Sequence, residues 1–189
     1  MNKILIVALL FCTSYLTAQN PEIKNGAPTL AFSPRPDEKV KKEFPFDIPI
    51  TDKQGLITNS AKALPSDGKP LVVFFWMTTC GPCRAELTAI KGKYEAWQKE
   101  APFKMVAVSI DFPTRHDAFK ERVQIEGWQW EAYHDWNREF TAVMPGNLNG
   151  VPQVFLFDKN GKIVYTTRKY IGGEEDELFA KIKEMSGVK

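Results

Sequence analysis

The chain has 189 residues, a hydrophobic fraction of 43% and a formal net charge of +2. This length and composition predict one globular domain with a sizeable core and room for a short extension. A charge so near zero argues against nucleic acid as the main partner, because phosphate binding needs a dense basic face.

The N-terminus has the order of a secretory signal peptide. The basic start Met1–Lys3 precedes a mostly apolar stretch over 4–16, and Ala18 offers a small residue for cleavage. We therefore expect residues 1–18 to direct export. An uncleaved membrane anchor is the alternative, although the apolar stretch is shorter than the roughly 20 residues that span a bilayer.

Residues 19–45 are rich in proline, which predicts an irregular N-terminal arm. The domain itself is expected over 46–189. Its first part, 46–60, predicts two short strands around Lys53-Gln54-Gly55. The stretch Leu71–Trp76 is apolar at every position, which is typical of a central strand covered by helices on both sides.

Strands and helices then alternate to the C-terminus. A helix is predicted after Trp76 to about Glu100, with an inward stripe of Ala85, Leu87, Ile90, Tyr94 and Trp97. Further strands are predicted over 103–110, 128–133, 154–157 and 163–166, the last two joined by Asp158-Lys159-Asn160-Gly161, a strong hairpin signal. Further helices are predicted over 114–126, 136–143 and from 174 onward. The acidic residues 174–177 suit the first turn of that last helix better than a cation site.

The chain has three cysteines, and cleavage after Ala18 would leave Cys80 and Cys83 as the only pair. A zinc site needs about four ligands, and the histidines His116 and His134 are not spaced as a finger-type pair. A purely structural disulfide that closes so short a loop would stabilise the fold little. The remaining interpretation is a dithiol that cycles between reduced and oxidised states.

The placement of the pair suits that chemistry. Cys80 follows a buried strand where a helix is expected to begin, and a helix N-terminus favours a thiolate. Cys83 lies one turn further on. Pro82 fits the first turn because its missing N–H costs nothing there. Cys80 can therefore attack a substrate disulfide, and Cys83 can resolve the mixed disulfide.

The segment "WMTTCGPCRAEL" resembles the thioredoxin superfamily, and together with the signal peptide it is similar to its extracytoplasmic TlpA/ResA-like branch. The resemblance implies an α/β thioredoxin fold: a mixed central β-sheet flanked by helices, with an N-terminal β-hairpin extension and a central α/β insertion. It implies an exported thiol–disulfide oxidoreductase with no cofactor beyond the Cys80–Cys83 disulfide and no metal.

Residue by residue, the resemblance implies that Cys80 is the nucleophile and Cys83 the resolving thiol. Glu86 matches a glutamate of ResA-like proteins that could raise thiol pKa values or relay protons; a surface helix glutamate is the alternative. Pro152, in "GVPQVFLF", matches the cis-proline that faces the dithiol. Substrate contacts are implied for Trp76, Thr79, Gly81, Pro82, Val151 and Pro152.

Three positions depart from thioredoxin. Phe74 stands where thioredoxin has a buried aspartate, which leaves Glu86 as the candidate proton acceptor for the resolving thiol. Thr79 replaces the tryptophan that usually precedes the first cysteine, so the site is expected to lack that apolar cover. Thr88 replaces a helix-kinking proline, so a straighter helix is expected.

The expected partners are oxidised proteins of the periplasm or another extracytoplasmic compartment, with apocytochrome c as one candidate, and a membrane thiol–disulfide electron donor. A disulfide oxidase or isomerase is an alternative. A peroxidase of the same fold is another, but Val73 and Met77 stand where that family's pattern has proline and threonine. The third is a thioredoxin-like binding module without enzymatic activity.

Two further groups of residues bear on these alternatives. The first group comprises the aromatic residues Trp128, Trp130, Tyr133 and Trp136. They either form a partner-binding face or pack in the core, and we favour core packing. His116 and His134 are isolated in the sequence and are expected to be surface or hydrogen-bonded residues, not catalytic bases.

Overall fold

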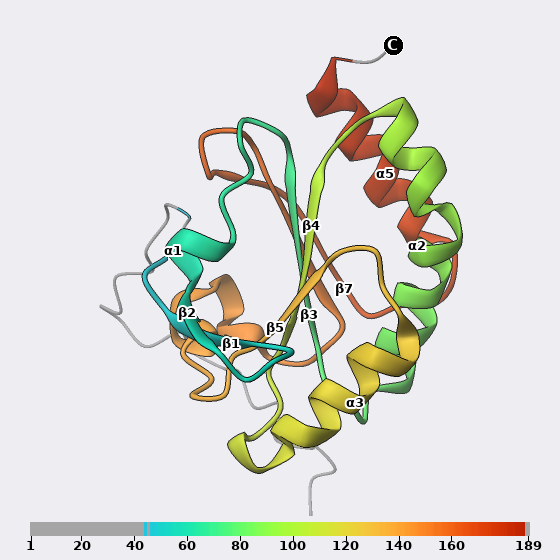
Figure 1. Cartoon of the computed structure of the whole chain (residues 1–189). Helices are drawn as coiled ribbons and strands as arrows, with labels where there is room; N and C mark the ends of the chain where they lie inside the picture. The colour runs from blue at the N-terminus through green and yellow to red at the C-terminus, as the bar shows by residue number, and fades with distance from the viewer. Residues whose placement is uncertain (1–43, 45, 188–189) are drawn as a thin grey trace, which may run out of the picture. The chain divides into compact units, whose positions relative to one another are not determined.

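A computed structural model describes residues 44 and 46–187 (Figure 1). The expected signal peptide, 1–18, lies outside the described residues, as does the proline-rich arm, 19–45, apart from Phe44. Within the described part, no helix is both long enough and apolar enough to span a bilayer.

One mixed sheet of seven strands organises the domain, in the order β2-β1-β5-β4-β3-β6-β7. The strands are β1 (Pro49–Asp52), β2 (Ile57–Asn59), β3 (Leu71–Trp76), β4 (Lys104–Ser109), β5 (Glu131–His134), β6 (Gln153–Phe157) and β7 (Ile163–Arg168). Strands β3, β4 and β5 are parallel, and β1, β2, β6 and β7 join by antiparallel pairing. The predicted α/β class, N-terminal hairpin and C-terminal hairpin are thus confirmed.

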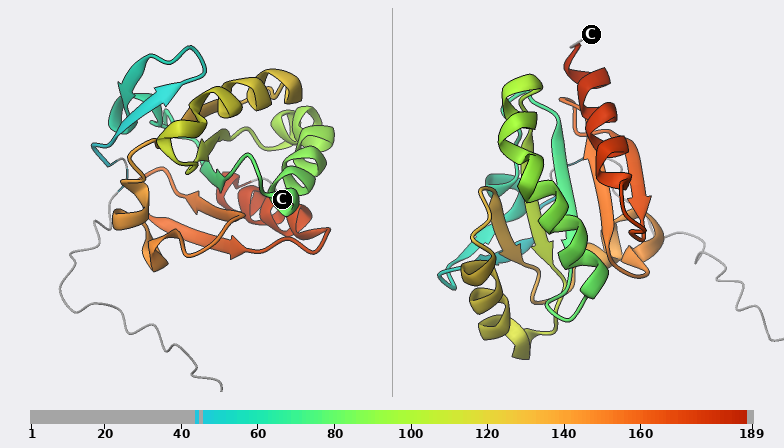
Figure 2. Two further views of the ribbon diagram at one scale, coloured as in Figure 1. Left: turned by 90° about the horizontal axis from the view of Figure 1, so that it is seen from below. Right: turned by 90° about the vertical axis from the view of Figure 1, so that its right-hand side faces the viewer.

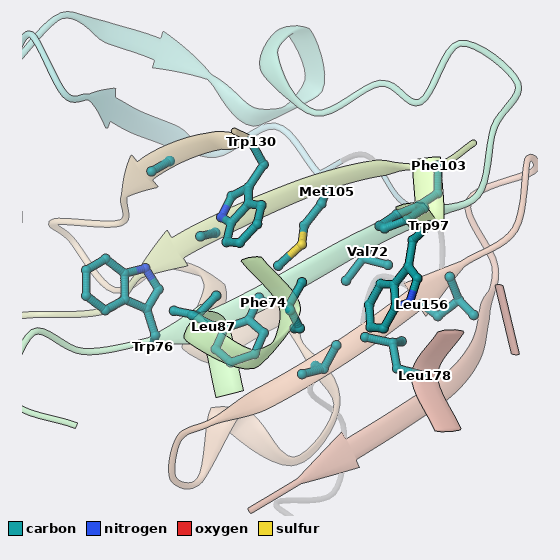
Figure 3. Packing of buried hydrophobic residues seen from close by; sticks show 14 of the residues in the cluster. Val72, Phe74, Trp76, Leu87, Trp97, Phe103, Met105, Trp130, Leu156 and Leu178 are labelled. Atoms are coloured by element: carbon teal, nitrogen blue, oxygen red, sulfur yellow. The ribbon is translucent and has the colours of Figure 1, made fainter. Parts of the chain in front are cut away.

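Strand β3 lies near the centre of the sheet, and all six of its residues are buried. Its side chains alternate between two cores, as period-two geometry requires. Val72, Phe74 and Trp76 join the core shown in Figure 3, under the longer helices. Val73 and Phe75 join the core on the opposite face of the sheet.

Helices cover both faces of the sheet. One face packs against α2 (Gly81–Glu100), α3 (His116–Glu126) and α5 (Glu174–Ser186), and α2 lies beside α5 (Figure 2). The other face packs against the short helices α1 (Ser60–Ala63) and α4 (Phe140–Val143) and the 3-10 turn η2 (Pro145–Leu148). Helix α2 runs without interruption through Thr88, and the acidic residues 174–177 form the first turn of α5 as expected.

Three predicted boundaries in the middle of the chain are wrong, and one short helix was not predicted. The helix expected over 136–143 is reduced to α4, because the Asp135 carboxylate binds the backbone N–H groups of Glu139 and Phe140, both at 2.9 Å, and so fixes the start of the helix there. The strand expected over 128–133 is β5, which begins three residues later. The part of the helix expected from residue 114 is a 3-10 turn, η1 (Pro113–Arg115), and α1 was not predicted.

Candidate functional site

The cysteine pair lies where β3 passes into α2. Cys80 is the N-cap residue of α2, and the backbone N–H of Cys83 lies 3.1 Å from the Cys80 sulfur. The two cysteines form a disulfide. Cys80 is partly exposed, whereas Cys83 is fully buried. Solvent and substrate can therefore reach only the first sulfur, as a nucleophile followed by a resolving thiol requires.

The segment before β6 faces the dithiol. The carbonyl oxygen of Val151 lies 3.7 Å from the Cys80 sulfur, and the Val151–Pro152 peptide bond is cis, as the resemblance predicts. Pro152 is buried and Val151 half-buried. The backbone N–H of Lys169, just after β7, donates to the Pro152 carbonyl at 3.2 Å. The end of β7 is therefore fixed beside the site.

The other predicted contact residues divide by exposure. Thr79, Gly81 and Pro82 are exposed around Cys80 and are free to contact a bound polypeptide. Trp76 is fully buried, which corrects its expected place among the substrate contacts. It packs edge-to-face against Trp128 with ring centroids 5.0 Å apart, and so supports the site from behind.

Glu86 is a buried acid one helical turn beyond Cys83. Its side chain is only 1% exposed, and both carboxyl oxygens are buried without a hydrogen-bond partner. Burial raises the pKa of Glu86 to about 8, and the negative charges of Glu174 and Glu175 add to the shift. The alternative of a surface helix glutamate is excluded by this burial. Cys83 and Glu86 share the inner face of α2.

A buried polar network holds the loop that carries Cys80. The Asp111 carboxylate accepts from the Thr78 backbone N–H at 2.8 Å, from the Thr78 hydroxyl at 3.0 Å and from the Ser109 hydroxyl at 2.7 Å. Arg115 Nε donates to the Thr78 hydroxyl at 3.2 Å. Asp111 and Ser109 are fully buried. The loop between β3 and α2 is thus tied to the end of β4.

The histidines expected to be isolated lie together behind this network. Their Nδ1 atoms are 3.0 Å apart, and His134 Nε2 lies 3.0 Å from the Asp111 carbonyl oxygen. A carbonyl only accepts, so His134 donates from Nε2; its neutral ring then accepts at Nδ1 from His116. Burial lowers the pKa of His134. Asp135 binds elsewhere, to the start of α4, and makes no pair with His134.

The four aromatic residues do not form one face. Trp130 is buried and Trp128 half-buried in the core beneath α2, where their rings stack with centroids 5.7 Å apart. Tyr133 packs against the core on the opposite side of the sheet. The core-packing interpretation is therefore confirmed for Trp128, Trp130 and Tyr133, although all three also line one surface cavity beside β5.

Asp111 was missed by the sequence analysis, although a signal for it was present. It is the first residue after the apolar stretch 103–110. In α/β proteins the carboxyl ends of parallel strands carry the functional site, so an acid at that edge, next to the strand that precedes Cys80, was a candidate. The loop over 169–173, which borders the site, carries no comparable signal.

Comparisons with known proteins show which proteins the chain is similar to. The chain is 30% identical over 97 residues to thiol-disulfide oxidoreductase ResA of Geobacillus thermodenitrificans, an alignment that covers 51% of this chain and 52% of the relative. The chain thus matches about half the length of that curated relative. A solved thioredoxin-like protein of Porphyromonas gingivalis, itself uncharacterized, is 34% identical with a TM-score of 0.65, over 75% of this chain and 91% of its own.

A second solved structure, described as a candidate protein disulfide isomerase from Bacteroides thetaiotaomicron, is 26% identical with a TM-score of 0.62, over 77% of this chain and 89% of its own. These similarities confirm the predicted thioredoxin-like fold and the resemblance to ResA-like proteins. Residues 36–166, well over half of the chain, match the model of one family. The chain belongs to the AhpC/TSA family.

Proposed function

We propose that this protein is a thiol–disulfide oxidoreductase that reduces disulfides of exported proteins. The observation that supports this most strongly is the Cys80–Cys83 disulfide at the start of α2, with one sulfur partly exposed and the other fully buried. The name of the ResA relative and the geometry of Val151 and Pro152 beside Cys80 support the same activity.

The reaction transfers two electrons to the substrate. The Cys80 thiolate attacks one sulfur of the substrate disulfide, which forms a mixed disulfide and releases the first substrate thiolate. Cys83 then loses its proton and attacks the Cys80 sulfur, which releases the second substrate thiolate and restores the Cys80–Cys83 disulfide. The two substrate sulfurs leave as thiols after taking up two protons. A dithiol donor at the membrane would return the enzyme to its reduced form.

Glu86 is a candidate to exchange the proton of the Cys83 thiol. Cys83 is buried, so its thiolate must form away from water, and Phe74 offers no acceptor at the position where thioredoxin has an aspartate. An acid whose pKa is about 8 can exchange a proton near neutral pH. At neutral pH only a minor fraction of Glu86 is ionised, and we assign this ionised fraction, which grows as pH rises toward 8, as the group that accepts the proton during resolution.

The test of the activity is insulin reduction by the mature chain with dithiothreitol as electron source. Cys80→Ser should abolish the activity, because no other cysteine is exposed at the site. Cys83→Ser should retain attack but not resolution, so it should accumulate a mixed disulfide that mass spectrometry detects. Full insulin reduction by Cys80→Ser would refute the proposal. Turnover of hydrogen peroxide by the wild type would favour the peroxidase alternative, against which Val73 and Met77 argue.

The role of Glu86 is tested on the Cys83 thiol alone. In a Cys80→Ser background, the rate of alkylation of Cys83 should rise with pH as its thiol loses a proton. Glu86→Gln should shift the pH at which this rise occurs, because the amide can neither carry the negative charge nor accept the proton. Iodoacetamide labelling across the pH range measures this curve. An identical curve in the two variants would show that Glu86 does not act on the thiol.

A further inference from the structure

Five basic residues lie on segments bound to, or next to, the loops that carry Cys80 and Pro152, although the chain as a whole is almost neutral. We define the basic rim as Arg84, Arg115, Arg138, Arg168 and Lys169. They come from the start of α2, from η1, from the loop before α4 and from the end of β7. The first, second and last of these segments contact Cys80, Thr78 or Pro152, and Arg138 of the loop before α4 contacts Phe112, next to Asp111. This clustering would not be expected from a formal net charge of +2.

The contacts of the described residues place the rim on two sides of Cys80. On one side, Arg168 stands opposite Gln153 in the sheet, directly after Pro152, and the Lys169 N–H binds the Pro152 carbonyl. On the other side, Arg115 binds the Thr78 hydroxyl at 3.2 Å. Arg84 lies in the first turn of α2, where its N–H is 3.3 Å from the Cys80 carbonyl oxygen.

Little of this positive charge is neutralised within the domain. In the described part of the chain, Arg84, Arg138, Arg168 and Lys169 form no ion pair. Arg84, Arg168 and Lys169 are exposed, and Arg138 lies over the Phe112 ring at 4.9 Å.

The acids near the dithiol are already engaged. Asp111 lies 3.6 Å from Arg115 and binds Thr78 and Ser109, and Glu174 accepts the N–H groups of Ile171 and Gly172. Glu175 and Asp176 pair with Lys93, and the raised pKa of Glu86 leaves it largely uncharged at neutral pH. Lys93 offsets one of the two charges of Glu175 and Asp176, and Glu174 keeps its own, so these acids leave two negative charges against the four unpaired cations Arg84, Arg138, Arg168 and Lys169, and the balance is positive.

Two exposed apolar side chains lie on the same segments as these charges. Phe112, which follows Asp111, is 57% exposed, and Ile171, two residues after Lys169, is 89% exposed. Exposed apolar groups of this size, on the segments that carry the unpaired cations, are suited to a polypeptide that carries both apolar and acidic residues.

We propose that the basic rim selects its partner: a polypeptide whose disulfide is flanked by acidic residues. This inference rests on the proposed oxidoreductase function and specifies the substrate class. The rim would raise the rate of encounter with such a segment by electrostatic steering and hold it with its sulfur at Cys80. Because the charges are exposed, this preference should weaken as salt increases.

Three synthetic peptides test the proposal, each closed by one disulfide and identical except for acidic, neutral or basic residues beside the half-cystines. Stopped-flow tryptophan fluorescence follows their single-turnover reduction by the reduced mature chain. At low salt the acidic peptide should react about tenfold faster than the neutral one, and the basic peptide more slowly still. The differences should shrink in about 0.5 M salt. Equal rates for the three peptides would overturn the proposal.

Charge reversal locates the effect. Arg168→Glu with Lys169→Glu should reduce or invert the ratio of acidic to basic peptide rates. The matched control, Lys159→Glu with Lys162→Glu, makes the same change of net charge at exposed positions in the turn at the opposite end of β6 and β7, and should keep the wild-type ratio. Arg84→Glu, from a different element, should also lower the ratio. A ratio that changes equally in rim and control variants would refute the assignment to the rim.

The small uncharged disulfide of 2-mercaptoethanol separates this proposal from the function on which it rests. If the reduced protein reduces neither this compound nor any peptide, the oxidoreductase proposal fails. If it reduces the compound and all three peptides at salt-independent, equal rates, the oxidoreductase function stands and the acidic-partner proposal fails.

Discussion

Glu86 has the most unusual environment of any residue at the site, because its carboxyl group is buried and has no hydrogen-bond partner. An unpaired buried carboxylate is costly, so the folded protein holds the proton that the unfolded chain would release. The raised pKa therefore makes the free energy of unfolding depend on pH. Between the ordinary pKa of 4.5 and the folded value of about 8, the folded state binds more protons than the unfolded state. Stability must then fall as pH rises through this window.

This effect predicts that Glu86→Gln removes a pH dependence of folding. Urea unfolding of the oxidised wild type should lose on the order of 1–2 kcal/mol between about pH 7 and about pH 8.5, and Glu86→Gln should lose less, since its amide does not titrate. The oxidised form is used because its disulfide cysteines do not titrate. Glu121→Gln, at an exposed position of α3, is the matched control and should keep the wild-type slope. A slope in Glu86→Gln equal to the wild-type slope would contradict the buried acid.

The sequence predicted the identity of the dithiol residues but only part of their surroundings. Cys80, Cys83 and Pro152 carry local signals, because a short motif and an X–Pro bond before a strand can be read directly. The burial of Glu86 depends on α5 and on the end of β7, which are distant in sequence. The pairing of His116 with His134 likewise needs β5 to lie beside β4, and residue spacing alone does not show that.

At the scale of elements, the loop between β3 and α2 is fixed by β4. Asp111 satisfies both the backbone N–H and the hydroxyl of Thr78, two residues before Cys80. A loop with so few other partners would otherwise sample several conformations at a cost in the rate of attack. Asp111 is therefore a positioning residue, since it acts on Cys80 through Thr78.

We predict that Asp111→Asn lowers both stability and the rate of disulfide attack. The amide loses one acceptor, so a buried donor of Thr78 or Ser109 is left without a partner at a cost of about 1–3 kcal/mol. Urea unfolding measures the stability. The rate constant for single-turnover reduction of a small disulfide, determined across a range of pH, measures attack by Cys80. Asp158→Ala, in the turn between β6 and β7, removes a carboxylate that accepts two backbone N–H groups far from the site, and it should lower stability without slowing attack. An unchanged attack rate in Asp111→Asn would reduce Asp111 to a structural residue.

Element types were more predictable than their ends. Uniformly apolar β3 and the turn at Asp158-Lys159-Asn160-Gly161 are local patterns, and the structure has both. The start of α4 was not predictable in the same way. Trp136 continues the helical pattern, but Asp135 caps the chain at Glu139 and Phe140, and Arg138 adopts a φ of +57°, outside the helical range. Capping by a side chain displaced the boundary from the place that hydrophobic periodicity indicated.

The domain as a whole combines a reactive sulfur at the end of a rigid strand with a surface that carries charge for a partner. The sulfur depends on β3, α2 and β4, which form the centre of the fold, whereas the rim residues Arg84, Arg168 and Lys169 have exposed side chains at the ends of elements. Substitutions of Arg84, Arg168 or Lys169 should therefore alter partner choice with little effect on the dithiol, whereas Arg115 also binds Thr78 and its substitution should affect both. Substitutions at Asp111 or Glu86 should instead alter the reactivity of the dithiol with little effect on partner choice.

The reduction potential of the Cys80–Cys83 pair tests the direction of electron flow in the intact domain. The Gly-Pro dipeptide, shared by resemblance with thioredoxin, predicts a value near or below about −250 mV, typical of a reductase. Equilibration with a glutathione or dithiothreitol buffer, followed by tryptophan fluorescence, measures the potential; Trp76 and Trp128, which pack behind the site, are suitable reporters. A value above about −180 mV would assign the protein to oxidation or isomerisation instead.

The reduction potential is also linked to the difference in unfolding free energy between the oxidised and the reduced domain. If it lies below that of the unfolded dithiol, the oxidised domain must be more stable to urea than the reduced domain, by about 1.4 kcal/mol for each 30 mV of difference. Agreement of the two measurements would show that the fold itself, through the environment of Cys80 and Cys83, sets the direction of electron transfer.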